Sequence, residues 1–448
     1  MPRYGRIDPA RFNLTQALAP FPVPMDSATE QVSVLAGVIG QDTPVYMTDN
    51  ERYFGREAIY GYPDDGERFI MYCRAALEML KQLGWQPDVI HCNDWHTGIV
   101  PNWLHTIYRD DPFFAKVATL YTIHNLQYQG IFGQRVLEVA GIDEYGFITR
   151  EDMADLSNVV DLMARGILFC DLISTVSEKY AEEILTPEYG ERLDPLLRDR
   201  RDCLFGVLNG IDYDEFNPAT DRYIAQNFDV ATLDRRLANK LALQREAGLP
   251  ERPDVPLIGM VSRLADQKGF DILEQIFEAM MSALDVQFVL LGTGDQHYHN
   301  IFSQFAERYP EKTAIFLTFN APLAQKIYAG SDMFLMPSRF EPCGLGQLIS
   351  LHYGAIPVVR STGGLADTVR DFDPRTETGN GFAFTPYRGM DLFATIVRAV
   401  ENYKYAATWR MLQERGMRED FSWDASARKY VDLYRRAMAN KEAENPNA

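Results

Sequence analysis

Short β-rich runs alternate with amphipathic helical segments along most of this sequence, in two successive sets. The first set begins near residue 68, and the second follows a polar stretch at about residues 220–253. Such alternation is typical of βαβ units, in which the strands form a parallel sheet and helices cover its faces. Because 448 residues are too many for one ordinary core, we predict an α/β protein with two Rossmann-like domains.

Within both sets the expected strands are short and apolar, and the expected helices carry apolar residues at helical spacing. One helical segment follows residue 68 and ends at Gly84, and another covers 268–284 with a methionine-rich stripe that we interpret as core. The expected strands cover 88–91, 116–124, 171–176 and 204–209 in the first set, and 256–262, 286–292, 314–318, 333–338 and 356–361 in the second.

The break between the two sets lies near residue 213. We predict an N-terminal domain over 1–213, a C-terminal domain over 214–422, a helix over 423–440 that packs back on the N-terminal domain, and a disordered tail over 441–448. Ligands of open parallel sheets bind at the carboxyl ends of the strands. We therefore expect the site in a cleft between the domains, where strands end.

Composition argues against several classes of protein. A formal charge of −19 opposes binding to a polyphosphate, so we expect no nucleic-acid partner. No apolar run reaches the ~20 residues of a membrane helix, so we expect no membrane association. The five cysteines are scattered and form no CxxC pair, which predicts reduced thiols in a cytoplasmic protein.

Two expected strand ends of the first domain carry candidate functional residues. The segment HCNDWHTG crowds His91, Asp94 and His96 into six residues, which suggests metal ligands, but no second cluster supplies the remaining ligands. A polar cap, with Asp94 as a helix N-cap and His91 bonded to backbone, is the structural alternative. Asp94 could also contact sugar hydroxyls, and His124 at the next strand end strengthens that interpretation.

The second domain carries a local pair of cations. Arg263 and Lys268 lie five residues apart, where an expected strand meets an expected helix. A helix N-terminus offers unpaired N–H groups, and two cations beside it suit a phosphate. The alternative is a pair of surface cations. The turn GTGD at 292–295 ends the next strand, but alone it is a weak signal for a ligand.

Two glycine turns follow later strands of the same domain. In SRFEPCGLGQ, Glu341 precedes a turn that opens a helix, and in STGGLADTV the residues Thr362, Gly363 and Gly364 repeat the pattern. With the two cations they predict a diphosphate cradle with a carboxylate at its edge. No G-x-G-x-x-G follows a strand and no Walker lysine motif is present, which disfavours dehydrogenases and P-loop kinases and favours sugar transfer.

Six motifs together carry a resemblance to a known family. HCNDWHTG, YTIHNLQYQG, VLNGIDYDEFNP, GMVSRLADQKG, SRFEPCGLGQL and STGGLADTV occur in this order and spacing. The sequence from residue 1 to about 436 thus resembles the bacterial glycogen synthases and starch synthases. That resemblance implies the GT-B fold and a retaining hexosyltransferase that moves glucose from ADP-glucose to the non-reducing end of an α-1,4-glucan or maltooligosaccharide.

The resemblance also implies roles for individual residues. The diphosphate would bind Arg263 and Lys268, and Glu341 would lie beside the donor glucose. It implies no metal or other cofactor, because cationic side chains and helix N-termini would act on the leaving group. The remaining positions it assigns are His124 for the donor sugar, Asp94 near the reacting centre, Asn209 at a hinge between domains, and Cys343, Gly344, Leu345, Thr362, Gly363 and Gly364 in the two turns.

Two departures from the family pattern lead to further expectations. Gly346 stands where the family commonly has threonine, which we expect to alter acceptor binding or loop packing but not the reaction. The sequence begins MPRYGRID, whereas family members have an earlier strand, a K-x-G-G-L loop and a helix before this segment. We expect either that Met1 is an internal methionine or that the chain as written is poorly stable and weakly active.

Two alternative functions remain open at this point. One is a related GT-B transferase that uses UDP-glucose or another sugar. The other is a catalytically impaired protein that binds glucan, which the absent lysine loop would explain.

Overall fold

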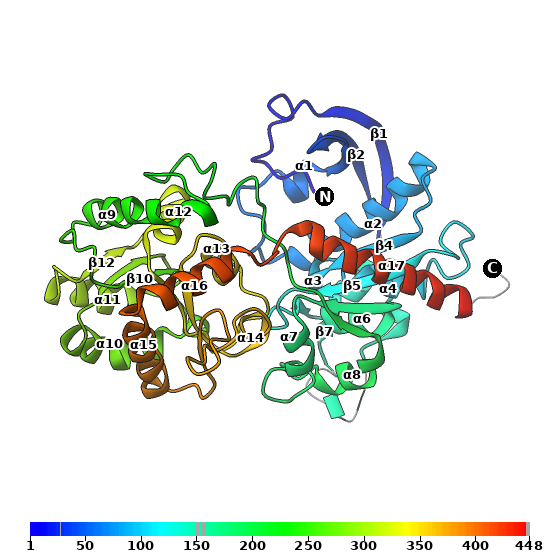
Figure 1. The fold of residues 1–448 in the computed structure, drawn as a ribbon. Helices are drawn as coiled ribbons and strands as arrows, with labels where there is room; N and C mark the ends of the chain where they lie inside the picture. The colour runs from blue at the N-terminus through cyan, green and yellow to red at the C-terminus, as the bar shows by residue number, and fades with distance from the viewer. Residues whose placement is uncertain (27, 149, 151, 154–157, 445–448) are drawn as a thin grey trace. The chain divides into compact units, whose positions relative to one another are not determined.

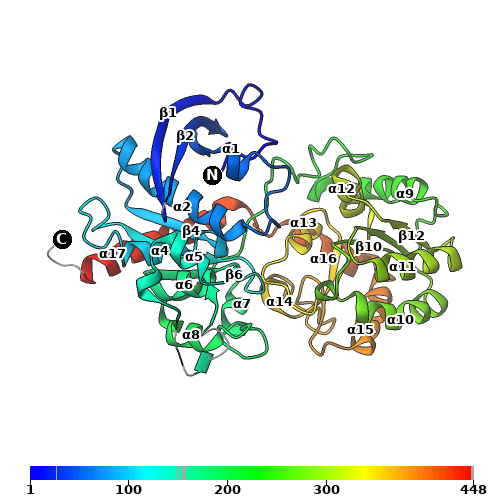
Figure 2. The same ribbon diagram turned by 180° about the vertical axis from the view of Figure 1, so that it is seen from behind.

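The computed structural model divides the chain into two compact units. It describes residues 1–26, 28–148, 150, 152–153 and 158–444. Unit 1 consists of residues 1–175, 183–205 and 430–448, and unit 2 of residues 176–182 and 206–429. Figures 1 and 2 show helices packed on both faces of the parallel sheet in unit 2, and helices beside the sheets of unit 1.

Unit 1 begins with an antiparallel sheet that we did not predict. Its strands have the order β1-β2-β3 and bounds β1 (Thr15–Met25), β2 (Ala28–Ile39) and β3 (Thr43–Asp49). In β1, the alternate residues Phe21, Val23 and Met25 are buried, and prolines stand between them. Proline fits an edge strand because no donor is needed on the open side. This two-residue period is the signal for the strand, whereas our prediction placed the first elements near residue 68.

A four-stranded sheet in the order β4-β5-β8-β9 forms the centre of unit 1, with parallel pairing between β4 and β5 and between β5 and β8. The structure confirms the four strands predicted for the first set, with ends that differ by a few residues. β5 is buried along its whole length. The elements are α1 (Glu51–Phe54), α2 (Asp65–Leu83), β4 (Val89–Asn93), α3 (Asp94–Thr97), α4 (Ile99–Leu104), β5 (Ala118–Ile123), β6 (Ile131–Phe132), α5 (Arg135–Ala140), η1 (Asp143–Tyr145), β7 (Val160–Asp161), α6 (Leu162–Phe169), β8 (Leu172–Thr175), α8 (Asp194–Asp199), η3 (Arg201–Cys203) and β9 (Leu204–Gly206).

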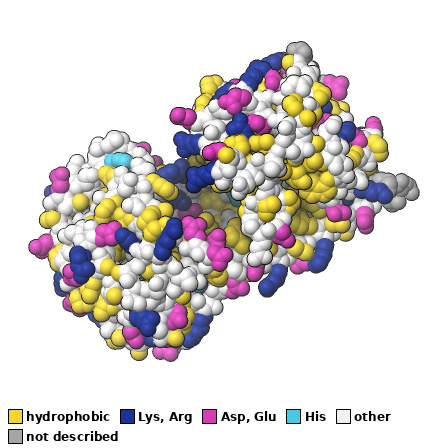
Figure 3. Space-filling model, turned by 90° about the horizontal axis from the view of Figure 1, so that it is seen from above, with side chains coloured by type: hydrophobic (Ala, Val, Ile, Leu, Met, Phe, Trp, Pro, Cys, Tyr) yellow, Lys and Arg dark blue, Asp and Glu magenta, His cyan; other side chains and the backbone are white. Residues whose placement is uncertain are grey.

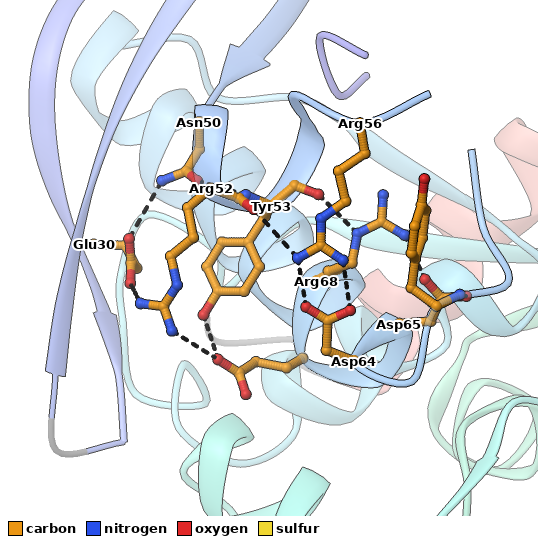
Figure 4. A network of polar contacts seen from close by, with 10 residues as sticks. Glu30, Asn50, Arg52, Tyr53, Arg56, Asp64, Asp65 and Arg68 are labelled. Atoms are coloured by element: carbon orange, nitrogen blue, oxygen red, sulfur yellow. Dashed lines mark hydrogen bonds and ion pairs between the residues drawn. The ribbon is translucent and has the colours of Figure 1, made fainter. Parts of the chain in front are cut away.

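Charged side chains connect the antiparallel sheet to α2 (Figure 4). Arg68 of α2 is fully buried, where its Nε donates to the carbonyl oxygen of Tyr53 at 2.7 Å and its guanidinium pairs with Asp65. Arg56 donates two hydrogen bonds of 2.6 Å to Asp64. A buried guanidinium is stable only where such acceptors surround it, so these bonds fix α2 against α1 and the loop that follows α1.

Unit 2 contains a six-stranded sheet made of β10 (Leu257–Val261), β11 (Gln287–Leu291), β12 (Thr313–Phe316), β13 (Met333–Met336), β14 (Ile356–Arg360) and β15 (Phe382–Phe384). Their order is β12-β11-β10-β13-β14-β15, with parallel pairing between all neighbours. The structure confirms the five strands predicted for the second set and adds β15. The methionine-rich stripe of α10 (Phe270–Ala283) lies in the core, as predicted: Met280 and Met281 are buried with Leu273 and Phe277.

The elements of unit 2 alternate strictly between strand and helix through most of its sequence. Apart from α7 (Glu178–Glu183), whose last residue belongs to unit 1, they are η4 (Val230–Arg235), α9 (Arg236–Glu246), β10 (Leu257–Val261), η5 (Asp266–Lys268), α10 (Phe270–Ala283), β11 (Gln287–Leu291), α11 (Gln296–Arg308), β12 (Thr313–Phe316), α12 (Ala321–Gly330), β13 (Met333–Met336), α13 (Gly346–His352), β14 (Ile356–Arg360), α14 (Gly363–Thr368), β15 (Phe382–Phe384), α15 (Gly389–Tyr403) and α16 (Ala406–Met417).

The last helix, α17 (Trp423–Glu444), begins in unit 2 and continues in unit 1 from Tyr430. Its unit 1 part packs on β4, where the hydroxyl of Tyr434 lies 2.9 Å from Nδ1 of His91. The helix extends past the predicted end at residue 440. Residues 445–448 of the predicted tail lie outside the described residues.

The cysteines, the surface charges and the helices of the described residues can be compared with what the composition predicts. All five cysteines are free, and only Cys203 is not buried. On the face that Figure 3 shows, Lys and Arg side chains lie among Asp and Glu side chains over most of the surface. Among the described residues, no helix combines the length and apolarity needed to cross a membrane.

Candidate functional site

Asp94 of unit 1 has an unusual backbone conformation at the end of β4. Its φ is +53°, in the left-handed region that costs most residues energy and that aspartate tolerates better than others. Its Oδ1 accepts a hydrogen bond of 2.9 Å from the backbone N–H of His124 at the end of β5. Burial raises the pKa of the Asp94 carboxyl, while His124 and the N–H groups of His124 and Asn125 act in the opposite direction.

His124 is therefore beside Asp94, as the two strand ends predicted. Its Nε2 lies 2.9 Å from Oδ1 of Asn93, the residue before Asp94. The two adjacent strand ends thus exchange contacts through both a backbone donor and a ring nitrogen. This arrangement places a carboxylate and an imidazole together at the carboxyl edge of the unit 1 sheet.

The polar-cap interpretation of this segment is wrong in its details. Asp94 is the first residue of α3, whereas the N-cap is Asn93, which makes no side-chain capping bond. His91 bonds to side chains, not to backbone, since its nitrogens lie 2.9 Å from Tyr434 Oη and 2.6 Å from Thr122 Oγ1. Both partners come from distant segments of the chain, which a local reading could not identify.

His91 and His96 are structural residues in unit 1. Burial lowers the pKa of each to about 4, so each imidazole is neutral near pH 7. His96 stacks on Trp95 with ring centroids 3.9 Å apart and meets Phe69 edge-on at 4.5 Å. Within the described part of the chain, no three His, Cys, Asp or Glu side chains gather as a metal site would require.

In unit 2, Lys268 and Glu341 form a close ion pair. Nζ of Lys268 lies 2.6 Å from Oε2 of Glu341, and the hydroxyl of Ser338 donates to the same oxygen at 3.0 Å. The Glu341 side chain is 7% exposed and that of Lys268 20%. The pair joins η5, which follows β10, to the loop after β13, so it brings the predicted cation and carboxylate into contact.

The two predicted glycine turns are pressed against each other through their backbones. A Cβ on Gly363, whose φ is +45°, would lie 2.0 Å from the carbonyl oxygen of Glu341. A Cβ on Gly364 would lie 1.9 Å from the carbonyl oxygen of Cys343. The backbone N–H of Gly364 donates to the backbone carbonyl oxygen of Glu341 at 3.1 Å. Only glycine permits this approach, so these two residues hold the Glu341 loop in place.

Further contacts fix the first turn from inside the unit. The backbone N–H of Asn209 donates to the Cys343 thiol, whose pKa burial raises to about 12. Gln347 of α13 donates from Nε2 to the carbonyl oxygens of Cys343 and Gly344, both at 3.0 Å. Gly344 adopts a φ of +72°. The turn is therefore held in one conformation by a backbone donor from Asn209 and a side-chain donor from Gln347.

The remaining predicted residues of unit 2 differ in their exposure. Thr362 is fully buried at the start of α14, and Leu345 at the start of α13 is 45% exposed. Arg263 is exposed after β10, where its Nη2 donates to Oε1 of Gln267 at 3.1 Å. Unit 2 thus gathers the predicted cations, the carboxylate and both turns at the carboxyl ends of β10, β13 and β14.

A cavity of about 780 Å³ adjoins this region of unit 2. Arg263 and the turn at 292–294 line it, so the GTGD turn, which is a weak signal in the sequence, borders a cavity in the structure. Its rim includes Phe319, whose side chain is 88% exposed. An exposed aromatic ring at a cavity of this size offers a face for a planar ring of a ligand.

Sequence reasoning missed three contributors: Ser338, Gln347 and Phe319. Ser338 and Gln347 stand inside the quoted motif, but their roles depend on contacts that motif reading does not give. Phe319 follows β12 at a strand end, and the same strand-end rule that identified Asp94 would have identified it.

Comparisons with known proteins cover both units. The family described as the starch synthase catalytic domain matches residues 1–199, and the family described as glycosyl transferases group 1 matches residues 244–413. A glycogen synthase of Moorella thermoacetica is 49% identical over 446 residues, which cover 99% of this chain and 90% of the relative. A glycogen synthase of Thermotoga maritima is 48% identical, with coverage of 89% and 82%.

Two solved structures superpose on this chain to different degrees. The catalytic domain of starch synthase IV from Arabidopsis thaliana, determined bound to ADP and acarbose, superposes with a TM-score of 0.88 and 33% identity, covering 98% of this chain and 91% of that one. A sucrose-phosphate synthase from Thermosynechococcus elongatus superposes with a TM-score of 0.58 at 17% identity, a likeness of fold alone.

Proposed function

Since this chain belongs to the glycogen synthase and starch synthase family, as a glucosyltransferase with the GT-B fold, we propose that its donor is ADP-glucose. We propose further that it extends the non-reducing end of an α-1,4-glucan with retention of configuration. The observation that carries this proposal is the Lys268–Glu341 pair, held between two interlocked glycine turns near the 780 Å³ cavity.

The cations of unit 2 act on the leaving group. Cleavage of the bond between glucose and phosphate develops negative charge on the departing diphosphate, and Arg263 and Lys268 are the charges that meet it. A fixed donor of this kind is worth about 10²–10³ in rate. Lys268 is positioned in advance, because its Nζ already contacts Glu341 at 2.6 Å. The nucleoside occupies the cavity, with its base on the ring of Phe319.

Glu341 and the glycine turns hold the donor glucose. A carboxylate can accept hydrogen bonds from sugar hydroxyls and stabilise positive charge on the sugar ring. Cys343, Gly344, Leu345, Thr362, Gly363 and Gly364 form the surrounding turns, and Asn209 supports them through Cys343. Asp94 and His124 of unit 1 serve the glucose and the acceptor end of the glucan.

The proposed reaction needs no metal ion or other cofactor, because side-chain cations take the place of a divalent ion. This is tested directly by turnover in the presence of EDTA, which we expect to leave the rate unchanged. A rate that falls with EDTA and returns with Mg²⁺ would contradict this part of the proposal.

The donor is tested by following nucleotide release with maltooligosaccharide as acceptor. We expect ADP release from ADP-glucose, with a kcat/KM at least tenfold above that for UDP-glucose. A preference for UDP-glucose would instead assign the chain to a related transferase. Glucan binding without release of either nucleotide would identify an impaired binding protein. NMR of the product reports the anomeric configuration of the new linkage.

The site assignment is tested by Lys268→Ala and Glu341→Ala. Each should lower turnover at least tenfold, because each removes a charge that faces the reacting atoms. The matched control is Lys326→Ala, which breaks an exposed ion pair with Glu246 of 2.8 Å and should leave turnover unchanged. Near-normal turnover in both site variants, with normal folding by circular dichroism, would refute the assignment.

A further inference from the structure

A second cavity in unit 2, of about 550 Å³, shares no lining residue with the first. It lies between α9, which contributes Arg236, Leu237 and Lys240, and α16, which contributes Ala406, Trp409, Arg410 and Gln413. None of its lining residues belongs to the proposed donor or acceptor machinery. From its charges and its walls we infer that this cavity binds a small monocarboxylate with an apolar body.

Arg236 provides the central donor. Its side chain is buried, and its Nε and Nη2 donate to the carbonyl oxygens of Tyr353 at 2.8 Å, Tyr328 at 3.0 Å and Ser331. No carboxylate of the described residues lies within ion-pair distance of it, and burial lowers the pKa of its guanidinium to about 10. Among the described residues Nη1 has no acceptor, so this nitrogen of a buried cation remains available to a ligand.

The second buried cation of the cavity is already neutralised. Nζ of Lys240 lies 2.7 Å from Asp332, 2.9 Å from the hydroxyl of Tyr403 and 3.1 Å from the carbonyl oxygen of Pro253. An ammonium has three donors, and these three acceptors use all of them. Lys240 thus shapes the wall but offers no hydrogen bond to a ligand.

A third cation stands at the rim. Arg410 donates from Nη1 to Asp234 at 2.6 Å and from Nε to Glu414 at 3.1 Å. Within the described chain its Nη2 has no acceptor, and about a third of the side chain is exposed. The cavity therefore offers a buried donor at Arg236 and a second one toward solvent.

The pairing of the charges decides the class of ligand. The lining residues include three cations, Arg236, Lys240 and Arg410. Lys240 pairs with Asp332, and Arg410 pairs with Asp234 and Glu414, so among the described residues Arg236 is the lining cation that has no carboxylate partner. One unpaired positive charge suits a monoanion, whereas a dianionic phosphate would leave a buried negative charge unmatched. The two oxygens of a carboxylate match separate N–H donors.

The walls indicate what the rest of the ligand is made of. Leu233, Pro253 and Trp409 line the cavity with Leu237, which is 47% exposed at its mouth. Apolar and aromatic walls around a few fixed polar groups are typical of small-molecule sites. A carboxylate on an apolar or aromatic body would bury that body against these side chains.

Benzoate is a suitable probe, because it combines one carboxylate with an apolar ring. Isothermal titration of the full chain should show one benzoate bound per chain at this cavity. Ala406→Trp, at the exposed start of α16, fills the mouth and should weaken binding at least tenfold. Ala407→Trp adds the same side chain one residue later, at an exposed position that does not line the cavity, and should bind as the wild type does.

Two further measurements keep the inference open to refutation. Arg410→Gln removes the rim donor and should weaken benzoate binding several-fold, whereas Arg418→Gln, whose arginine pairs with the same Glu414 outside the cavity, should not. Inorganic phosphate should bind this cavity more weakly than benzoate. No benzoate binding, equal binding in Ala406→Trp and wild type, or tighter phosphate binding that Ala406→Trp abolishes would each overturn the inference.

Discussion

The candidate sites of the two units are built in different ways. In unit 2 the site is held by contacts between backbone segments, because Gly363 and Gly364 lie where any Cβ would approach a carbonyl oxygen to about 2 Å. In unit 1 the site is held by a side chain, because the carboxylate of Asp94, a residue in the left-handed conformation, accepts a hydrogen bond from the backbone N–H of His124. The structure of the unit 2 site should therefore tolerate almost no change of residue at its turns, whereas the structure of the unit 1 site should tolerate changes that keep a short polar side chain, even where activity is lost.

Gly364→Ala should have the largest effect. Its new methyl group overlaps the carbonyl oxygen of Cys343, so the Glu341 loop must move. We expect a loss of about 3 kcal/mol in the free energy of unfolding and a fall in turnover of about 100-fold, since a shift of 1 Å at a site costs that much. Urea unfolding and steady-state kinetics measure the two effects.

Gly133→Ala in unit 1 is the matched control, because a Cβ there has no atom within 4 Å and its φ is ordinary. It should change stability by less than about 0.5 kcal/mol. Equal behaviour of the two variants would show that the packing of the unit 2 turns does not constrain the site.

The buried acids of the two units also differ. Asp332 of unit 2 pairs with Lys240 at 2.7 Å, whereas Asp161 of unit 1 has no cation within ion-pair distance among the described residues. Burial raises the pKa of Asp161 to about 7, although its Oδ1 accepts from the N–H of Ala164 at 2.8 Å. The ionised form of Asp161 is therefore a cost to the folded state.

Asp161→Asn should remove that cost, with an effect that depends on pH. Because the folded pKa lies above the unfolded value, the wild type loses stability as pH rises from about 4 to about 7, by up to about 1.4 kcal/mol per pH unit. The variant keeps a capping oxygen and loses this term, so its advantage should grow over that range. His91 and His96, whose pKa values are lowered, act in the opposite direction in both proteins and cancel in the difference. Urea unfolding at pH 5, 6 and 7 measures the difference in the free energy of unfolding between the variant and the wild type. A difference that stays constant over these pH values would contradict the expectation.

Asp94→Asn and Asp94→Ala test the side-chain character of the unit 1 site. Both remove the carboxylate and should lower turnover at least tenfold if the proposed role is correct. Asparagine keeps an acceptor for His124 and tolerates the left-handed conformation, whereas alanine does neither. Alanine should therefore cost about 1–2 kcal/mol more stability than asparagine, measured by thermal unfolding. Equal stability would show that the conformation of Asp94 is unstrained.

Phe319→Ala should have the smallest effect on stability. The side chain is 88% exposed, so its removal should change the free energy of unfolding by less than about 0.5 kcal/mol. The proposed stacking of a base on this ring predicts a several-fold increase in KM for the nucleotide sugar with little change in kcat. An unchanged KM would remove Phe319 from the donor site.

Local patterns in the sequence were enough to predict the α/β class and nine strands of the two central sheets, because periodicity depends only on neighbouring residues. They also placed Arg263, Lys268, Glu341 and Asp94 at strand ends. The three-stranded antiparallel sheet escaped prediction, since its strands include prolines and lie before the first recognised alternation.

What only the tertiary structure decided are contacts between residues far apart in the chain. Lys268 and Glu341 are separated by 73 positions, and their approach at 2.6 Å depends on β10 and β13 being neighbours in the sheet. The sequence by itself determined that Gly363 and Gly364 form a turn that opens a helix. The fold determined that the turn presses on the carbonyl groups of the Glu341 loop, because strand order and loop packing are non-local properties that no short segment contains.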